Sequence, residues 1–423
     1  MSTFRDRNRN TSSKRLLVLI FAILIVDGII GSLVYPVLPD FFRTSHNPEL
    51  LFGLSTVIFA LMQMLFAPVL GALSDARGRA PIFRVAAVGT ALSMLLLLPV
   101  TVPLLLVNRF SDGATNGLYA VIKSAIVDVS EPDDVPRNVG LSLSLSYVGF
   151  LVGPGLAAVV LSLAEGFGWN STRSLIITGI CFAAVNVALS FGLPETRPNA
   201  RPSAETSSQF NLVAAIRSAS PVQLVRRIRR LRTVQPDLFL LLSLHALVIL
   251  SIGYYSYFVI FAARSPIALD GRGIAFLFLY FALLGVISNT VFFARVLSRV
   301  APLPTVRTLL LCGFAVLISY GLFAGSSLIA MYVLLTIDML TISLVPAVME
   351  GLIGQHANES QRGEVFGLSQ SIASMMGVIS AILATVLSTI DLRFPFFAFA
   401  CAAAVAAVVS FRVHGPALRP RAE

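Results

Sequence analysis

Long apolar runs recur along the whole chain, and clusters of charged residues separate one run from the next. A helix needs about 20 apolar residues to cross the hydrocarbon core of a bilayer. Apolar types make up 56% of the 423 residues, enough for twelve such helices, and only 12% are charged. These runs exclude a soluble globular domain and a disordered chain. They also disfavour a β-barrel, whose strands alternate apolar and polar residues.

The runs form two sets of six with nearly equal lengths, 179 and 176 residues. We therefore predict an all-α membrane protein with 12 transmembrane helices in two pseudosymmetric six-helix bundles. The predicted domains are an N-terminal bundle at 1–194, a cytoplasmic linker at 195–236 and a C-terminal bundle at 237–423. The predicted spans are 16–39, 50–72, 81–100, 103–127, 139–163, 174–194, 237–263, 272–297, 304–323, 327–349, 363–389 and 394–412.

The linker contains the basic stretch QLVRRIRRLR, and two interpretations of it stay open. In the first, residues 210–232 form a basic amphipathic helix on the membrane surface. In the second, the linker is a solvated segment that only carries cytoplasmic charge. The first interpretation predicts that these apolar residues face lipid: Phe210, Leu212, Val213, Leu224, Val225, Ile228 and Leu231.

The distribution of Lys and Arg predicts the orientation of the chain. With a cytoplasmic N-terminus, the inside segments hold 24 of these residues and the outside segments hold 5. Such a bias places the richer side, and here both termini, in the cytoplasm. The net charge of +10 is therefore interpreted as loop charge and not as a nucleic-acid surface. The first apolar run, about 24 residues long, exceeds the short apolar core of a cleaved signal, so we predict a retained span.

Four of the ionisable residues inside predicted spans stand out, because such a group costs several kcal/mol unless it faces a cavity or a partner. They are Asp27, Arg109, Asp112 and Asp338. Asp27 lies about 17 Å into the first span, near the bilayer midplane. Asp112 and Asp338 occupy equivalent depths in the fourth and tenth spans, which correspond to each other in the two halves.

These four residues are predicted to couple protons to substrate. The alternatives are a structural salt bridge for Arg109 and a purely structural role for Asp27 and for Asp338. Arg109 and Asp112 share one helix face because they are three residues apart. Polar and aromatic residues in the spans are candidates for a substrate cavity, although each also suits a packing role. They are Gln63, Asn116, Tyr254, Tyr255, Tyr257, Asn289 and Gln370.

No metal site, disulfide framework or cofactor is predicted. All three cysteines lie inside apolar runs, and the four histidines are isolated. We find no nucleophile–base set and no glycine-rich phosphate loop, so an enzyme is not expected.

The stretch 61–82, LMQMLFAPVLGALSDARGRAPI, resembles a motif of the major facilitator superfamily, G-x-L-x-D-R-x-G-R-R. Gly71, Leu73, Asp75, Gly78 and Arg79 match it, whereas Ala76 and Ala80 stand at two of its basic positions. The resemblance implies a gate, in which an acid and basic residues clasp neighbouring helix ends and hold one face closed.

The fifth span resembles the antiporter motif of this superfamily, G-x8-G-x3-GP-x2-GG. Gly140, Gly149, Gly153 and Pro154 match, and two alanines replace the last glycine pair. Glycines at this spacing let helices approach closely, and proline bends the span.

Two further segments resemble the tetracycline/proton antiporters of the drug/proton antiporter family with twelve spans. DGIIGSLVYPVLPDF begins at Asp27, nine residues before the first proline, and Arg109 with Gly113 matches the fourth-span motif R-x-x-x-G. Asp112 departs from that family, which usually has a small residue there. Leu193-Pro194-Glu195-Thr196 resembles the signature that closes the N-terminal half.

The resemblance implies a proton-coupled efflux antiporter in the bacterial inner membrane, exporting small amphipathic, drug-like compounds by alternating access. It further implies three partners, a small-molecule substrate, protons and the lipid bilayer, with no nucleic acid; we expect a monomer. The alternatives are a dedicated exporter of a metabolite or siderophore and, less favoured, a proton-coupled importer.

Overall fold

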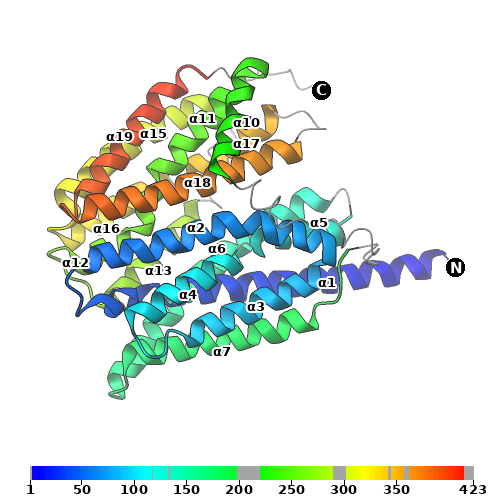
Figure 1. The fold of residues 1–423 in the computed structure, drawn as a ribbon, viewed down its shortest axis with the longest axis horizontal. Coiled ribbons are helices and arrows are strands. Elements are labelled where there is room, and N and C mark those ends of the chain that lie inside the picture. Colours follow the sequence, from blue (N-terminus) through cyan, green and yellow to red (C-terminus); the bar gives the residue numbers. More distant parts are fainter. Residues whose placement is uncertain are drawn as a thin grey trace. The chain divides into compact units, whose positions relative to one another are not determined.

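The computed structural model shows a chain that is helical almost throughout (Figure 1). No β-strand occurs in the part of the chain that the structure describes. The predicted all-α fold is confirmed. The structure describes residues 2–116, 118–131, 134–197, 220–288, 302–341, 344–356 and 362–413.

The described helices account for the predicted spans. Eight segments are long and apolar enough to cross a membrane. Two shorter apolar helices, α13 (Gly271–Ile287) and α19 (Phe394–Ser410), add two more. The remaining two predicted spans correspond to α3 (Arg79–Leu95) and to the successive helices α4 (Val102–Asn116) and α5 (Leu118–Val129).

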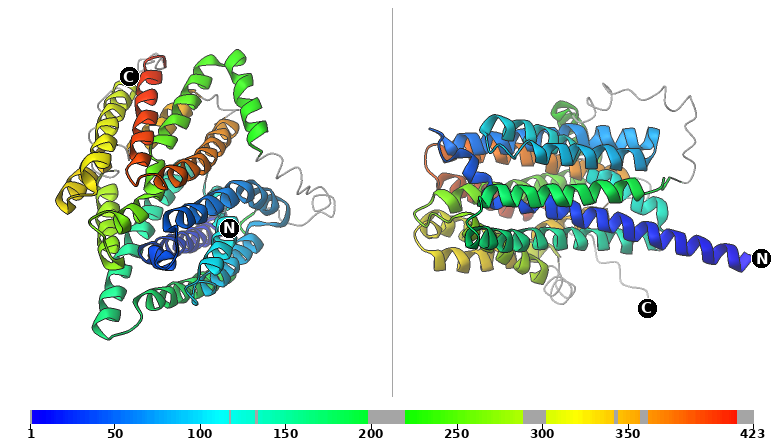
Figure 2. Two further views of the ribbon diagram at one scale, coloured as in Figure 1. Left: turned by 60° about the vertical axis from the view of Figure 1, so that its left-hand side comes forward. Right: turned by 90° about the horizontal axis from the view of Figure 1, so that it is seen from below.

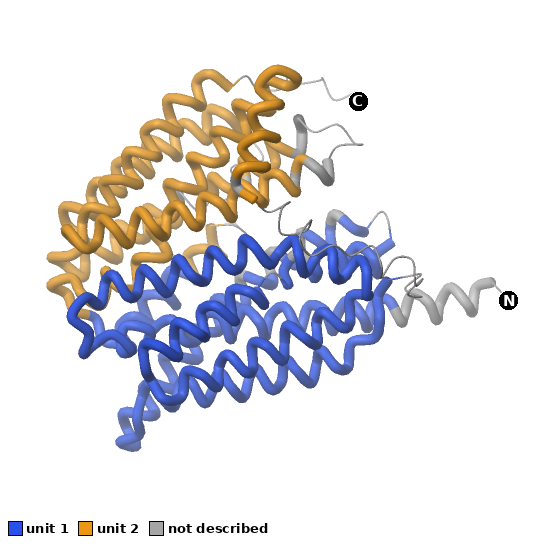
Figure 3. The backbone as a smooth tube through the Cα atoms, in the orientation of Figure 1, with its two compact units in different colours: residues 1–219, 269–282 blue, residues 220–268, 283–423 orange. Residues whose placement is uncertain are grey.

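The chain divides into two compact units (Figure 3). Unit 1 comprises residues 1–219 and 269–282, and unit 2 comprises residues 220–268 and 283–423. The start of α13 belongs to unit 1 through contacts such as the stacking of Phe278 on Tyr35, with ring centroids 6.3 Å apart. The predicted domain boundaries stay a prediction.

In unit 1, one long helix organises the packing. The helix at Ser2–Leu33, α1, packs side by side with α6 and α7 (Figures 1 and 2). In the same unit α2 packs on α4, and α3 packs on α7. The bounds of the other elements of this unit are η1 (Tyr35–Phe42), α2 (Pro48–Arg77), α6 (Val135–Gly166) and α7 (Ser171–Gly192).

Local sequence signals start these helices. Proline stands in the first turn of α2 and α6, where a missing backbone N–H leaves no hydrogen bond unmade. At the start of α7, the side-chain oxygen of Asn170 accepts a hydrogen bond from the backbone N–H of Arg173 at 2.9 Å. This N-cap satisfies one of the free donors of the helix end.

The core of unit 1 gathers aliphatic and aromatic side chains of α1, α3 and α5. Ile20, Ile23, Phe83, Val121 and Ile126 are all fully buried in it. Buried residues of this core recur three or four apart, as Ile20 and Ile23 do on α1 and Ile122 and Ile126 do on α5, and one face of each helix is therefore buried within the protein.

Unit 2 is built around the helix at Pro236–Ser251, α11, which packs on α17, α18 and α19. Two short irregular helical segments interrupt the spans of unit 2. The first, η3, is a 3₁₀ turn, and the second, η6, is a π-helix. The bounds in this unit are α10 (Pro221–Val234), η3 (Gly253–Ser256), α12 (Phe258–Arg264), α15 (Pro302–Ser319), η6 (Tyr320–Ala324), α16 (Leu328–Thr341), α17 (Leu344–His356) and α18 (Arg362–Ser388).

The basic linker segment forms a helix, α10, over its described part. Its apolar face does not point to lipid as the surface-helix interpretation predicted. Leu224 is 6% exposed, and Leu224, Ile228 and Leu231 pack against the unit 2 core. Val225 stays exposed. The other three residues of that prediction, Phe210, Leu212 and Val213, lie outside the described residues.

Candidate functional site

Asp27 lies in the membrane-spanning part of α1 and is half-buried. Its Oδ1 accepts a hydrogen bond from Asn186 Nδ2 of α7 at 3.4 Å. The carboxylate of Asp112 is near enough to act on it electrostatically. No ion pair to Asp27 occurs among the described residues, so no basic side chain compensates its negative charge directly.

Arg109 and Asp112 form the ion pair that their spacing predicts. Nη2 of Arg109 lies 3.7 Å from Oδ2 of Asp112, and the two side chains are only 9% and 13% exposed. Nε of Arg109 donates to Oδ1 of Asn108 at 2.9 Å, and its guanidinium lies over the Phe59 ring at 5.6 Å. The positive charge of Arg109 is therefore directed at Asp112 and its own helix.

A second polar contact joins α2 to α4. Nε2 of Gln63 donates to Oδ1 of Asn116 at 2.7 Å. At this seam a β carbon on Gly113 would lie 2.5 Å from the carbonyl oxygen of Phe59. The glycine of the R-x-x-x-G motif, Gly113, thus allows α4 to approach α2 closely. The cavity candidates Gln63 and Asn116 form a hydrogen bond with each other at the same seam.

Gly149 and Gly153 of the antiporter motif lie where α6 meets α1. A β carbon on Gly149 would be 3.0 Å from the α carbon of Gly28, and one on Gly153 would collide with the Ser32 hydroxyl. Ser32 Oγ donates to the carbonyl oxygen of Gly28 at 2.8 Å. Backbone therefore packs directly on backbone along this seam, one turn from Asp27.

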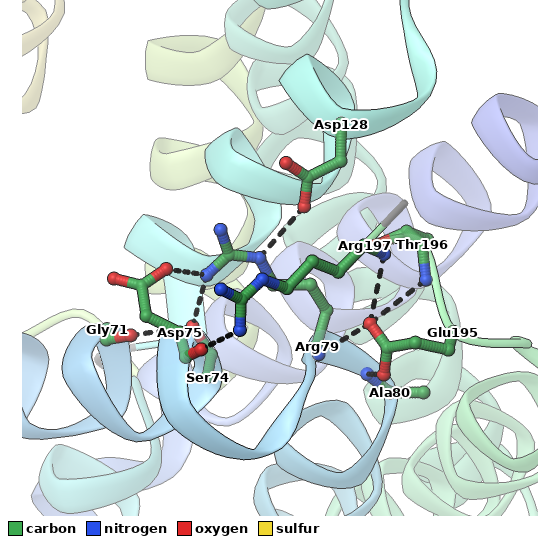
Figure 4. Close-up of polar contacts among 9 residues, drawn as sticks. All are labelled: Gly71, Ser74, Asp75, Arg79, Ala80, Asp128, Glu195, Thr196 and Arg197. Atoms are coloured by element: carbon green, nitrogen blue, oxygen red, sulfur yellow. Dashed lines mark hydrogen bonds and ion pairs between the residues drawn. The ribbon is translucent and has the colours of Figure 1, made fainter. Parts of the chain in front are cut away.

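Arg79 is the hub of the loop motif (Figure 4). Its Nη1 contacts Asp75 Oδ1 at 2.5 Å and Ser74 Oγ at 2.7 Å, and its Nε contacts Asp128 Oδ2 at 2.9 Å. The Arg79 side chain is 9% exposed, whereas that of Asp75 is 65% exposed. One buried guanidinium thereby ties the end of α2 to the end of α5.

Glu195 holds the first turn of α3 (Figure 4). Its carboxylate accepts hydrogen bonds from the backbone N–H groups of Arg79 at 2.9 Å and Ala80 at 3.2 Å. A carboxylate at a helix N-terminus satisfies free donors and matches the helix dipole. Gly78 makes room for it, because its φ is +96° and a β carbon there would collide with the Glu195 carboxylate.

In unit 2, Asp338 of α16 is fully buried and accepts two tyrosine hydroxyls at Oδ2. Tyr254 donates from the 3₁₀ turn η3, and Tyr320 donates from the π-helix η6 at 3.1 Å. Rings of Phe396 and Phe399 surround Tyr254. Both irregular turns therefore direct a hydroxyl at one carboxylate.

One of the remaining cavity candidates, Tyr255, lies beside Tyr254, with ring centroids 4.3 Å apart. Tyr257 is buried and donates to the carbonyl oxygen of Leu392 at 2.9 Å, which is a packing role. Gln370 is exposed, Tyr255 is half-buried, and Asn289 lies outside the described residues. No group of three or more metal-ligating side chains occurs among the residues described.

The sequence interpretation missed several residues of these networks, among them Asn186, Asp128 and Tyr320. Asn186 is the single amide in an otherwise apolar sixth span, and that rarity was a usable signal. Asp128 follows the predicted end of the fourth span by one residue, so a search for charges inside spans does not reach it. Tyr320 had no signal, because a π-helix turns it toward Asp338.

The comparisons with known proteins agree with this architecture. The sequence model of the Major Facilitator Superfamily matches residues 20–349. The chain belongs to the Major Facilitator Superfamily. It is therefore a multi-pass membrane transporter and not an enzyme.

The class H tetracycline resistance protein of Pasteurella multocida is 33% identical to this major facilitator over 148 residues. That stretch is 34% of this chain and 37% of the relative, so the chain spans only about a third of the length of such relatives. The class C tetracycline resistance protein of Escherichia coli is 32% identical over the same shares.

Among solved structures, the inward-open E. coli xylose transporter XylE covers 96% of this chain with a TM-score of 0.68. The match takes in 98% of that structure at 14% identity. The human organic anion transporter MFSD10 covers 94% of this chain, with 99% of that structure matched, a TM-score of 0.66 and 18% identity. At these identities the likeness shows the fold alone, and the predicted major facilitator fold is confirmed.

Proposed function

We propose that this major facilitator is a proton-coupled efflux antiporter that exports small amphipathic, drug-like compounds by alternating access. One observation carries the proposal. Asp27 lies within a spanning helix without an ion pair among the described residues, while the cation Arg109 is directed at Asp112.

An isolated carboxylate in a low-dielectric region is costly, so a proton or a cationic ligand must neutralise it. The two cannot occupy one carboxylate together. Proton uptake from one side then displaces cargo, and cargo binding from the other side displaces the proton. That competition is the chemistry of antiport.

The other sites support the same cycle. Arg109 and Asp112 set the charge beside Asp27, and Asp338 contributes a second carboxylate from unit 2. The Arg79 network at the cytoplasmic loop stabilises one closed state, and the Gly28–Gly149 seam keeps α1 and α6 packed. Relatives named as tetracycline resistance proteins favour export of drug-like cargo.

The same proposal includes the bacterial inner membrane, cytoplasmic termini and a monomeric protein. A dedicated exporter of a metabolite or siderophore is the alternative. To separate the two, a host lacking its own pumps is grown with the chain on a panel of toxic compounds. Raised resistance supports drug export, and no change for any compound supports the dedicated exporter.

The coupling is tested in proteoliposomes that carry a pH gradient. Substrate-dependent proton flux is measured for the wild type, Asp27→Asn and Asp237→Asn, an exposed acid at the start of α11. We expect Asp27→Asn to abolish the flux and Asp237→Asn to preserve it. A proton flux in Asp27→Asn as large as that of the wild type would rule out the role of Asp27, and substrate transport by the wild type without proton flux would rule out the coupling.

A further inference from the structure

The helix α10 carries five arginines and no acidic residue in 14 positions. All five are exposed, and none is ion-paired among the described residues. Such a one-sign surface favours a polyanionic partner. The five are Arg226, Arg227, Arg229, Arg230 and Arg232.

One face of α10 fixes the direction of these arginines. Leu224, Ile228 and Leu231 are four and three residues apart, and all three pack on the core of unit 2. This apolar stripe holds the helix against α11 and α18. The guanidinium groups are thereby presented on the sides of the helix that point away from the core.

The chain connection keeps α10 beside the start of a membrane span. Only Gln235 separates the end of α10 from α11, which opens the membrane span Pro236–Arg264. A helix of 14 residues is about 20 Å long. It therefore cannot leave the neighbourhood of the lipid headgroups while its apolar face is packed on the core.

One flank of α10 has the composition of an interfacial helix. Val222 and Val225 are 59% and 38% exposed, and Arg229 follows on the same helix face. Apolar side chains beside arginines suit the boundary between acyl chains and headgroups. The acidic surface of a soluble protein would pair with the arginines but would not bury the exposed valines beside a membrane span.

We propose that the arginine face of α10 binds the phosphate groups of anionic phospholipids on the cytoplasmic leaflet. Guanidinium groups bind phosphate oxygens through paired, charge-assisted hydrogen bonds. The negative potential of that leaflet adds to the attraction. Bound lipid would fix α10, and through its packing the start of α11, at the membrane surface.

The test uses the purified full chain in a neutral detergent. Thermal unfolding is followed with added phosphatidylglycerol, phosphatidylcholine or inorganic phosphate. The triple variant Arg226→Gln, Arg229→Gln, Arg230→Gln is compared with the matched triple lysine variant. The glutamine variant still has 21 of the 24 Lys and Arg residues in the segments predicted to face the cytoplasm, against 5 in the outside segments. The charge bias that orients the protein in the membrane is therefore kept.

We expect phosphatidylglycerol alone to raise the Tm of the wild type. The lysine variant should keep most of this shift, and the glutamine variant should bind the lipid more weakly, on the order of a hundredfold. An equal shift with phosphatidylcholine, or an undiminished shift in the glutamine variant, would overturn the proposal. A shift with inorganic phosphate as large as with the lipid would overturn it in favour of a free-anion site.

A second measurement needs only the wild type and therefore tests the proposal even if the glutamine variant fails to fold. The wild type is placed in nanodiscs of equal phosphatidylglycerol and phosphatidylcholine, and the lipids retained after extraction are counted by mass spectrometry at low and high salt. Enrichment of phosphatidylglycerol that salt removes supports binding through exposed charges. No enrichment at low salt would refute it.

Discussion

Gly28 of α1 and Gly149 of α6 meet backbone to backbone, with no space for a side chain between them. A β carbon on Gly149 would lie 3.0 Å from the Gly28 α carbon and 2.7 Å from the carbonyl oxygen of Ile25. Asp27 precedes Gly28 directly. The packing seam and the candidate proton site therefore share one turn of α1.

Gly149→Ala is expected to separate the two helices and lower the free energy of unfolding by about 1–3 kcal/mol, as overpacking does. Detergent-solubilised protein and thermal unfolding provide the measurement. Gly31→Ala is the control, because a β carbon on Gly31 meets no heavy atom within 4 Å. Similar Tm values for both variants would show that the seam tolerates a methyl group.

Arg79→Gln is expected to destabilise the protein much more than Asp75→Asn. Arg79 is nearly buried and binds Asp128, whose side chain is only 18% exposed, so its loss leaves that carboxylate unpaired. The expected loss is about 3 kcal/mol for Arg79→Gln. Asp75 is 65% exposed, and its pair with Arg79 is worth less than about 1 kcal/mol.

The same two variants separate stability from the transport cycle. Asp75→Asn should slow transport in proteoliposomes while substrate binding at equilibrium stays close to that of the wild type. An equal loss of binding and transport would contradict a gating role for Asp75. Adding Asp128→Asn to Arg79→Gln should restore part of the lost Tm, because the stranded charge is gone.

Gly78→Ala is expected to damage the loop in two ways. Its φ of +96° is unfavourable for any residue with a β carbon, and that β carbon would displace Glu195 from the start of α3. Glu195→Gln removes only the charge at the helix end, worth about 0.3–1 kcal/mol. Thermal unfolding should rank Gly78→Ala as the less stable variant, with Gly71→Ala as an unstrained control.

The spans and motifs were predictable because their determinants are local. An apolar run of about 20 residues crosses a bilayer wherever it occurs in the chain. The Arg109–Asp112 pair follows from a spacing of three residues on one helix. In the same way, the glycines of the fifth span predict that another helix packs closely there, but they do not identify which helix it is.

The long-range contacts were not predictable from spacing. Glu195 reaches Gly78 across 117 residues, and only the fold brings the two together. The hydrophobic pattern of α10 predicted an apolar face but not what covers it, because lipid and a protein core favour the same residues. Only the packed structure distinguishes them.

Asp338→Asn distinguishes two roles of Asp338, that of a hydrogen-bond acceptor for two tyrosines and that of a carboxylate that takes up and releases a proton. The asparagine side chain has nearly the same shape, and its carbonyl oxygen still accepts the hydroxyls of Tyr254 and Tyr320. We therefore expect an almost unchanged Tm and a reduced number of protons released per substrate in proteoliposomes. Asp338→Leu removes the acceptor as well, strands two buried hydroxyls at about 1–3 kcal/mol each and should lower the Tm clearly. If Asp338→Asn releases protons as the wild type does while Asp338→Leu unfolds early, the carboxylate only ties η3 and η6 to α16 and takes no part in coupling.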